Sequence, residues 1–235
     1  MVTSDATHSP RFRRVAVALC WGAIIGQTLF TIAWLVSDSL QGGDFSPLRD
    51  DISDLGALTA NHPWIILAAQ GVSGVLTICF AIFVLNRTLA GPGQKMALGA
   101  WLVAMSAVAV DDLSDAFFRL DCQTSQPGCS EATAMASWHG QIHAIVGIVS
   151  FILLVIAPFF LARSMRKLPS WSALAKPTKY FGVGLGVLLA VYVGLTGQDG
   201  QGTMQRIIAL TASAGVCLLA VRAMRIRHSA TALAA

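Results

Sequence analysis

The sequence predicts an all-α polytopic membrane protein, a bundle of six transmembrane helices with both termini in the cytoplasm. Three observations predict this fold. Hydrophobic residues make up 55% of the chain and charged residues only 12%, against about 25% charged residues in a soluble domain. Six apolar runs each have close to the ~20 residues that cross a bilayer core. Finally, most basic residues lie in the tails and loops on one side of the predicted membrane.

The apolar runs divide almost the whole chain into spans and short loops. They cover residues 15–36, 64–85, 96–117, 138–162, 180–196 and 204–221. Residues 15–222 therefore form a single membrane domain, between an N-terminal tail at 1–14 and a C-terminal tail at 223–235. The first run is longer than the ~7–15 apolar residues of a cleaved signal peptide, so we expect it to remain as an anchor.

The charges orient the predicted bundle. Thirteen of the 16 basic residues lie on the side that holds both termini, and eleven of the 12 acidic residues lie on the opposite side. Positively charged loops stay in the cytoplasm, so the acidic loops are expected outside the plasma membrane. The basic pI of about 9.0 does not predict nucleic-acid binding, because the cations are spread over helix ends. Membrane lipids are the expected partners; the sequence does not indicate an oligomeric state.

Two cysteines lie in the loop between the third and fourth runs, on the side expected to be oxidising. They are Cys122 and Cys129, with six residues between them. A disulfide would hold this loop over the outer face. Two free thiols are the alternative, because a sequence does not show the Cα separation that a disulfide requires.

An acidic segment, RDDISDLG at residues 49–56, precedes the second run. Asp51 and Asp54 are three residues apart and share a face if this segment is helical. With Ser53, Asp54 is a candidate catalytic residue. The alternative is a solvated loop in which an aspartate caps the start of a helix.

Three further aspartates end the third run. Asp111 and Asp115 are spaced i, i+4, and Asp112 lies three residues before Asp115. Carboxylates near the hydrocarbon boundary face the protein interior or a water-filled cavity. Asp111 and Asp115 are therefore candidate catalytic residues, unless the span has already ended and all three are in water.

Two histidines open the fourth run. His139 and His143 are one helical turn apart, a spacing with which two imidazoles can bind one metal ion. The third and fourth runs are antiparallel, which places Asp115 at a similar depth as a third ligand. Two histidines and a carboxylate suit zinc, iron or manganese, and zinc is the predicted cofactor. The alternative is a pair of interfacial histidines that hydrogen-bond their neighbours.

One arginine on the acidic side begins the sixth run. Arg206 could bind a phosphate or carboxylate headgroup, which makes it the candidate substrate-binding residue. It could also pair with Asp54 or with the Asp111 group, or extend to the membrane surface as an anchor.

These features together resemble the domain of unknown function 998 family, six-span membrane proteins of bacteria and archaea. The resemblance covers residues 15–222: SPLRDDISDLGA before the second span, aspartates at the end of the third, a histidine opening the fourth and GxxxxR at the sixth. It implies the six-span architecture but no agreed activity. The residues Ser53, Asp111 or Asp115, His139 and His143 are also similar in type to those of the alkaline ceramidase and adiponectin-receptor hydrolases. That group has seven spans and three zinc histidines, so a carboxylate would have to replace one ligand here.

The sequence leaves two classes of function open. In one, a metal-bound hydroxide attacks an amide or ester of a lipid-like substrate. In the other, the acids, histidines and Arg206 form a polar network that packs the bundle, or that binds or transports a proton or cation. Transport would require polar groups that continue to the cytoplasm, and Gln27, Gln70 and Ser73 are the few candidates within the spans.

Overall fold

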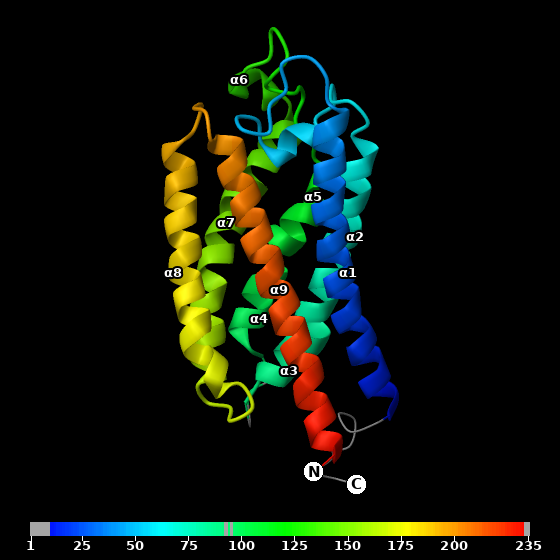
Figure 1. Cartoon of the computed structure of the whole chain (residues 1–235), viewed down its shortest axis with the longest axis vertical. Helices are drawn as coiled ribbons and strands as arrows, with labels where there is room; N and C mark the ends of the chain where they lie inside the picture. Colours follow the sequence, from blue (N-terminus) through cyan, green and yellow to red (C-terminus); the bar gives the residue numbers. More distant parts are fainter. Residues whose placement is uncertain (1–9, 92–93, 95, 233–235) are drawn as a thin grey trace.

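Helices make up most of the chain in this computed structural model, which describes residues 10–91, 94 and 96–232 (Figure 1). No strand occurs in these ranges, so the predicted all-α class is confirmed. Shorter helical segments join five long helices. The long ones are α1 (Pro10–Leu40), α2 (Trp64–Phe80), α7 (Trp138–Met165), α8 (Ser172–Gly194) and α9 (Gln201–Ala232).

Five helical stretches are long and apolar enough to cross a membrane: Arg13–Leu40, Trp64–Leu89, Trp138–Met165, Ser172–Gly194 and Gln201–Ile226. Large apolar side chains cover their outward faces. Trp21 is 53% exposed, Ile148 65% and Leu218 69%. Apolar surface of this extent is favourable in lipid and unfavourable in water. The chain is therefore a multi-pass membrane protein.

The predicted third span is broken in the middle, which corrects the expectation of one continuous helix over residues 96–117. Its parts are α4 (Leu98–Ala104), the π-helical turn η3 (Ala107–Asp111) and α5 (Asp112–Asp115). At the break, Ser106 has extended backbone and its hydroxyl donates to the Val103 carbonyl at 2.8 Å. Gln27 donates to the Val108 carbonyl at 3.2 Å. Irregular backbone is tolerated at membrane depth where such partners within the protein bond it.

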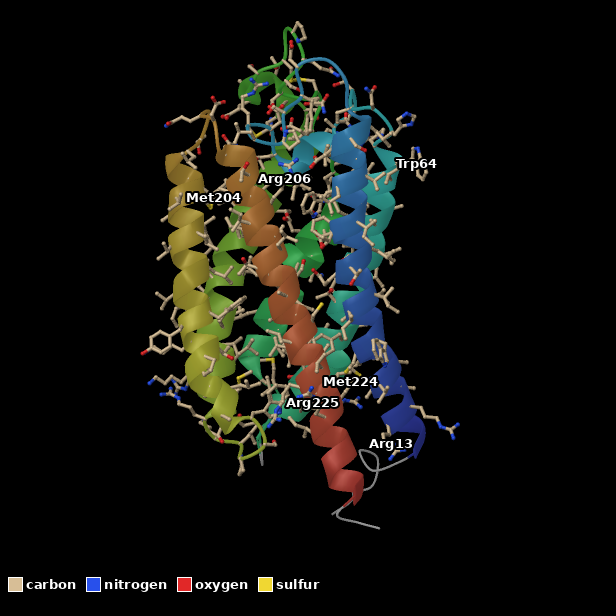
Figure 2. All side chains as sticks on the ribbon, viewed as in Figure 1. Arg13, Trp64, Met204, Arg206, Met224 and Arg225 are labelled. Atoms are coloured by element: carbon tan, nitrogen blue, oxygen red, sulfur yellow. A yellow bond between two sulfur atoms is a disulfide. The ribbon has the colours of Figure 1, made fainter. Side chains whose placement is uncertain are left out.

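The six segments form a closed ring. Helix α1 packs against α2 and α9, α7 packs against α8 and α4, and α8 packs against α9. The broken segment lies between α2 and α7 and runs from one end of the bundle to the other (Figure 1). We call the end with η1 (Ile52–Gly56) and α6 (Glu131–Ala134) the loop end, and the end where α1 begins the terminal end. Figure 2 labels Trp64, Met204 and Arg206 near the loop end, and Arg13 and Arg225 near the terminal end.

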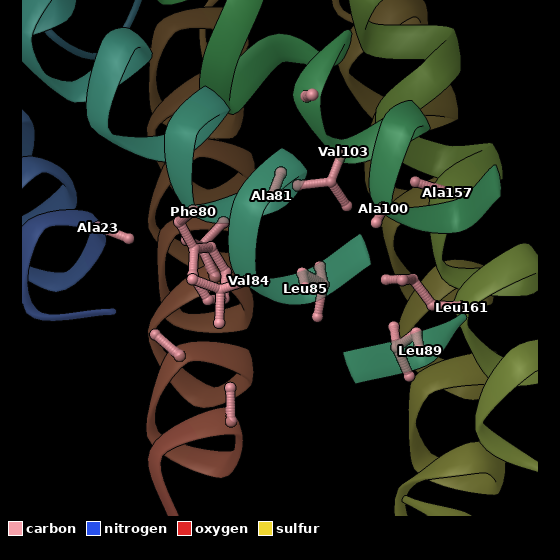
Figure 3. Close-up of a cluster of buried hydrophobic side chains, with 14 of the residues drawn as sticks. Ala23, Phe80, Ala81, Val84, Leu85, Leu89, Ala100, Val103, Ala157 and Leu161 are labelled. Carbon is pink, nitrogen blue, oxygen red and sulfur yellow. The ribbon is translucent and has the colours of Figure 1, made fainter. Parts of the chain in front are cut away.

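The apolar core fills the half of the bundle nearer the terminal end. Helix α2 continues through a second π-helical turn, η2 (Ala81–Leu85), into α3 (Asn86–Leu89). The buried side chains of this segment belong to one apolar cluster with Val103 and Leu161, part of which Figure 3 shows. The core of this half is therefore made of buried apolar side chains.

Two element ends differ from the sequence prediction. Helix α8 begins at Ser172, so Pro177 lies inside a helix rather than in the predicted connection at 163–179. Pro177 removes one helical hydrogen bond in the second turn of α8 and crowds the carbonyl four residues earlier, but the helix continues to Gly194. Helix α9 extends to Ala232, so the predicted C-terminal tail is helical over most of its length. Residues 1–9 of the predicted N-terminal tail lie outside the described ranges.

Candidate functional site

A cavity of about 670 Å³ opens at the loop end of the bundle. Its polar lining comes from η1, the end of the broken segment and the loop-end turns of α7, α8 and α9. Its apolar lining lies deeper on the same helices and includes Phe151, Leu154, Leu189, Ile208 and Ala212. Because α7 and α9 run away from the loop end and α8 runs toward it, these positions lie farther into the bundle than His143, Gln205 and Tyr192. The cavity is therefore amphipathic along its depth.

An aspartate and a histidine pair at the wall of the cavity. Nδ1 of His143 lies 2.9 Å from Oδ1 of Asp115 and 3.2 Å from the carbonyl oxygen of Phe118. The same nitrogen therefore faces a backbone carbonyl and a carboxylate, both of which favour a proton on Nδ1. Gln70 donates to the other oxygen of Asp115 at 2.8 Å. These contacts fix the imidazole by Nδ1, so Nε2 is the nitrogen that can exchange a proton with the cavity.

The other two aspartates of the third predicted span are also buried and line the cavity. Asp111 is 8% exposed and Asp112 is 5% exposed. Oδ1 of Asp111 and Oδ2 of Asp112 have no hydrogen-bond partner within the described residues. Asp111 lies in the π-helical turn and Asp112 directly follows it; π-turns occur often at functional sites. Of the two alternatives that the sequence leaves open for these acids, the structure has the buried one.

A polar network continues from Asp112 toward the middle of the bundle. Ser73 lies beside Asp112 and accepts a hydrogen bond from Gln27 at 3.0 Å. Gln27 also donates to Thr77, and its carbonyl oxygen accepts from the hydroxyl of Ser213 at 2.6 Å. Gln27 therefore joins α1, α2, the broken segment and α9, which explains a fully buried glutamine in a membrane span.

The helix η1 covers the loop-end side of the cavity and carries Asp51 at its start. Tyr192 and Gln201 donate to the same oxygen of Asp51 at 2.6 and 2.9 Å. Burial raises the pKa of Asp51 to about 6, although these two hydrogen bonds oppose the shift. Ser53 also lines the cavity and is half-buried.

Asp54 is buried rather than solvated, and a neighbouring loop holds it. The backbone N–H and the hydroxyl of Thr124 donate to Oδ1 of Asp54 at 2.8 and 2.9 Å, and the N–H of Asp51 donates to Oδ2 at 3.2 Å. Burial raises the pKa of Asp54, and the Thr124 hydrogen bonds act against this rise. Asp54 thus fastens η1 to the loop that Thr124 belongs to.

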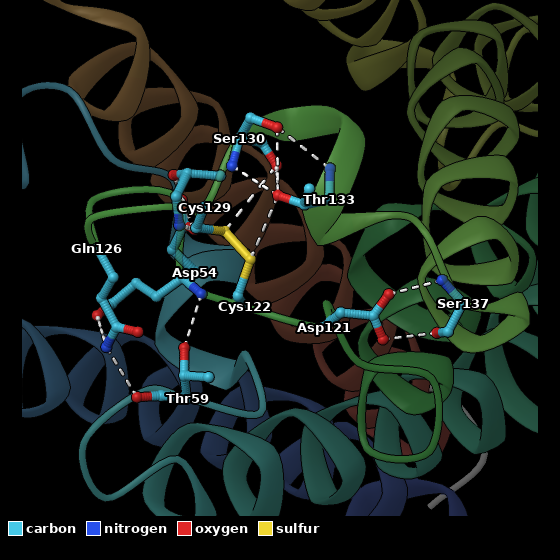
Figure 4. The surroundings of a disulfide bond; sticks show 11 residues. Asp54, Thr59, Asp121, Cys122, Gln126, Cys129, Ser130, Thr133 and Ser137 are labelled. Carbon is cyan, nitrogen blue, oxygen red and sulfur yellow. Dashed lines mark hydrogen bonds between the residues drawn. A yellow bond between two sulfur atoms is a disulfide. The ribbon is translucent and has the colours of Figure 1, made fainter.

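That loop contains the predicted disulfide, which is present between Cys122 and Cys129 with a Cα–Cα distance of 6.1 Å (Figure 4). Next to it, Asp121 accepts hydrogen bonds from the N–H and the hydroxyl of Ser137 at 2.7 and 2.6 Å. These bonds lower the pKa of Asp121. Ser137 in turn caps the start of α7. The disulfide loop therefore connects η1 to the helix that carries His143.

The two predicted metal-binding histidines have different surroundings. The His139 ring packs 3.7 Å from the Trp138 ring and 5.9 Å from the Phe118 ring, and His139 does not line the cavity. His143 contacts Asp115 directly, which leaves no room for an ion between them. Among the described residues no group of three His, Cys, Asp or Glu side chains could hold a metal ion. The described residues therefore do not fit the zinc site expected from the sequence, and elemental analysis is the measurement that tests zinc binding.

Arg206, the predicted headgroup contact, is a buried anchor in this structure. Its Nη2 and Nε donate to the two oxygens of Asp38 at 2.6 and 3.0 Å. Its Nη1 faces the carbonyls of Pro47, Asp50 and Gly202 at 3.1, 2.8 and 3.0 Å. Asp54 and the Asp111 group, the partners predicted from the sequence, are thus not its ion-pair partners, and Arg206 is not part of the cavity lining.

Comparison with known proteins places the chain in a family. The model of the DUF998 family, proteins of unknown function, matches residues 24–222. The chain belongs to the DUF998 family. This confirms the resemblance seen in the sequence, and the DUF998 match includes every residue that lines the cavity. No curated protein and no solved structure matches the chain. The comparisons contain nothing on the alkaline ceramidase and adiponectin-receptor group, so that likeness stays a prediction.

Sequence reasoning missed two residues that shape the DUF998 site. Tyr192 lies near the end of the fifth apolar run, where a tyrosine is equally typical of a membrane interface. Asp38 lies two residues after the end of the first apolar run. An acid at a span end together with an arginine at another span end is the signal that could have suggested the Asp38–Arg206 pair.

Proposed function

We propose that this DUF998 protein binds an amphipathic, lipid-like molecule in the loop-end cavity and hydrolyses it by acid–base catalysis. The observation that carries the proposal is the change along the cavity from carboxylates and His143 at the loop end to apolar side chains in the interior. A volume of about 670 Å³ lies within the ~300–1,000 Å³ of small-molecule sites. The polar headgroup would lie at the loop end and the hydrocarbon part between α7, α8 and α9.

His143 is the proposed general base, and Asp115 and the Phe118 carbonyl are its positioning groups. Nε2 would take a proton from a water molecule while the water oxygen bonds to the carbonyl carbon of an ester or amide. The imidazolium formed in this way would donate that proton to the leaving oxygen or nitrogen as the bond to that carbon breaks. Asp111, which lines the same cavity, would remain a carboxylate and stabilise this imidazolium by its charge.

The other predicted site residues take supporting roles in this proposal. Both oxygens of Asp54 already accept hydrogen bonds, so Asp54 would hold η1 in place and not exchange protons. Ser53 lines the cavity and is proposed to contact the headgroup.

We also propose that the broken segment is a sixth span and that the loop end faces the outside of the plasma membrane. Support comes from the disulfide at the loop end, which requires an oxidising compartment, and from basic residues at the terminal end. Single cysteines at Asp199 and Ser170, in a chain without Cys20, Cys79 and Cys217, test this orientation. A membrane-impermeant maleimide should label Asp199→Cys in intact cells and Ser170→Cys only after lysis. The reverse pattern would refute the orientation.

Hydrolysis is better supported than the two alternatives that the sequence leaves open. A packing network satisfies its members, whereas Asp111 and Asp112 each keep an oxygen without a partner in the described structure. A transport path would continue from Gln27 to the terminal end. The fully buried side chains described there, including Phe80, Val84 and Leu85, are apolar (Figure 3).

Lipid hydrolysis by the detergent-purified protein is the test. A total membrane lipid extract is incubated with wild type, His143→Gln, Asp115→Asn and the exposed control Asp199→Asn, and the products are followed by mass spectrometry. We expect a released acyl or amine product with wild type and the control, and a loss of about 100-fold or more in His143→Gln. Equal rates in wild type and His143→Gln, or no product from any lipid class, would refute the hydrolase proposal.

A further inference from the structure

We infer that the molecule bound in the cavity carries a positively charged headgroup, an ammonium group attached to a hydrocarbon chain. This inference rests on the cavity of the proposed function and names the class of substrate. It comes from the charge of the lining, from the acceptors left without partners and from the shape of the space beyond them.

The lining is strongly acidic. It contains seven acidic side chains and two basic ones. Both basic groups already face an acid: Arg49 lies 3.2 Å from Asp50, and His143 lies 2.9 Å from Asp115. The remaining carboxylates therefore have no basic side chain of the cavity wall to balance them.

Several of these carboxylates have acceptor oxygens without partners. Oδ1 of Asp111, Oδ2 of Asp112 and Oδ1 of Asp51 accept no hydrogen bond in the described structure. Asp111 and Asp112 are more than nine-tenths buried and line the cavity. A buried acceptor without a partner is unfavourable, and carboxylates this close together repel one another unless a positive charge or a proton lies among them. A ligand ammonium group would supply that charge.

The cavity is not arranged for an anionic headgroup. Phosphate and carboxylate headgroups are recognised by arginine or by backbone N–H groups. Arg206 is buried beside the loop that leads to η1. Its guanidinium donates to Asp38 and to the carbonyls of Pro47, Asp50 and Gly202. An anion among Asp51, Asp111 and Asp112 would be repelled.

The depth and walls of the cavity favour a cationic amphiphile over a bare ion. A small cation would leave the apolar interior at Leu154, Leu189 and Ile208 unused. Two aromatic rings also line the cavity: those of Phe151 and Tyr192 are nearly parallel, with ring centroids 6.3 Å apart. Ring faces attract ammonium groups.

The cavity also reaches the lipid-facing side of the bundle. Ile148 and Ile152 of α7 and Val193 of α8 line it and are 65%, 48% and 61% exposed. A hydrocarbon chain could enter from the bilayer at this side, with its ammonium group directed to the aspartates at the loop end.

Calorimetric titration of the full chain in a non-ionic maltoside tests the inference. The probes share one twelve-carbon chain: dodecyltrimethylammonium, dodecanol and dodecanoate. We expect the ammonium probe to bind about tenfold more tightly than the alcohol, and dodecanoate to bind most weakly. The double variant Asp111→Asn, Asp112→Asn should lose this order, and the exposed control Asp199→Asn should keep it.

The comparison of probes on wild type does not depend on the folding of any variant. Equal affinities for the ammonium and the alcohol, or no binding of the ammonium probe between pH 5 and 8, would overturn the inference and leave protons as the balancing charge. Hydrolysis of neutral lipids without an ammonium preference would overturn this inference but not the proposed function. Ammonium binding without hydrolysis of any lipid would overturn the proposed function but not this inference.

Discussion

Asp38 and Arg206 are 168 residues apart in the chain and form a bidentate ion pair, with nitrogen–oxygen distances of 2.6 and 3.0 Å. The pair joins the end of α1 to the start of α9, and both side chains are about nine-tenths buried. The same guanidinium lies 5.7 Å from the Trp34 ring and binds carbonyls of the loop that leads to η1. The ion pair therefore positions the loop before η1, the helix that covers the loop-end side of the cavity.

Removal of this guanidinium should strongly destabilise the protein. Arg206→Ala leaves Asp38 as a buried charge without its partner, which costs about 3–5 kcal/mol. Arg206→Lys should have an intermediate stability, because lysine keeps the positive charge but cannot form the bidentate contact with Asp38. Thermal unfolding of the detergent-purified variants measures this, with Arg163→Ala, an exposed arginine, as the control. If Arg206→Ala has the same melting temperature as the control, the ion pair does not stabilise the loop before η1.

The buried Asp51 predicts a specific pH dependence of stability. Its pKa is raised from 3.8 to about 6 in the folded protein, so the folded state binds more protons than the unfolded state between about pH 4 and 6. Stability therefore falls as pH rises through this window. Asp51→Asn should make the melting temperature fall less between pH 4 and 7 than it does in wild type. The variant Asp44→Asn, at an exposed loop position, should follow wild type; if Asp51→Asn does so too, the assignment to Asp51 is wrong.

Gly74 allows α2 to touch the backbone of the broken segment. A Cβ atom there would lie 2.6 Å from the Ala109 carbonyl oxygen and 2.7 Å from the Leu113 nitrogen. Both are backbone atoms, so no side chain can rotate away. Gly74→Ala should cost about 1–3 kcal/mol and displace Asp111 and Asp112, with weaker binding of the ammonium probe. Gly184→Ala, where nothing lies within 4 Å of the added atom, is the matched control, and equal melting temperatures for the two would contradict the close packing.

The surroundings of His139 and His143 predict that the purified protein holds no stoichiometric zinc. His139 packs on Trp138, and His143 contacts Asp115 without space for an ion between them. Elemental analysis of wild type and of the double variant His139→Ala, His143→Ala measures this. About one zinc per chain in wild type, lost in the variant, would restore the metal-dependent mechanism that the HxxxH spacing suggests.

The positions of the long helices, the family and the disulfide could be predicted from the sequence because each depends on local information. A span needs only enough consecutive apolar residues, and the disulfide needs two cysteines in a short loop. The break at Ser106 could not be predicted. Its backbone is stabilised by Gln27 of another helix, and the apolar run 96–110 carries no proline to signal an interruption.

The amino-acid sequence by itself determined that the chain crosses a membrane and that its acids collect at one end of the bundle. Only the tertiary structure decided which of these groups meet. It paired Asp115 with His143, assigned Arg206 to Asp38, separated His139 from the cavity and left oxygens of Asp111 and Asp112 facing it. The physical reason is that hydropathy sets the depth of a residue in the membrane, whereas the rotation of each helix about its axis sets its partners. That rotation is fixed by packing between helices distant in the chain.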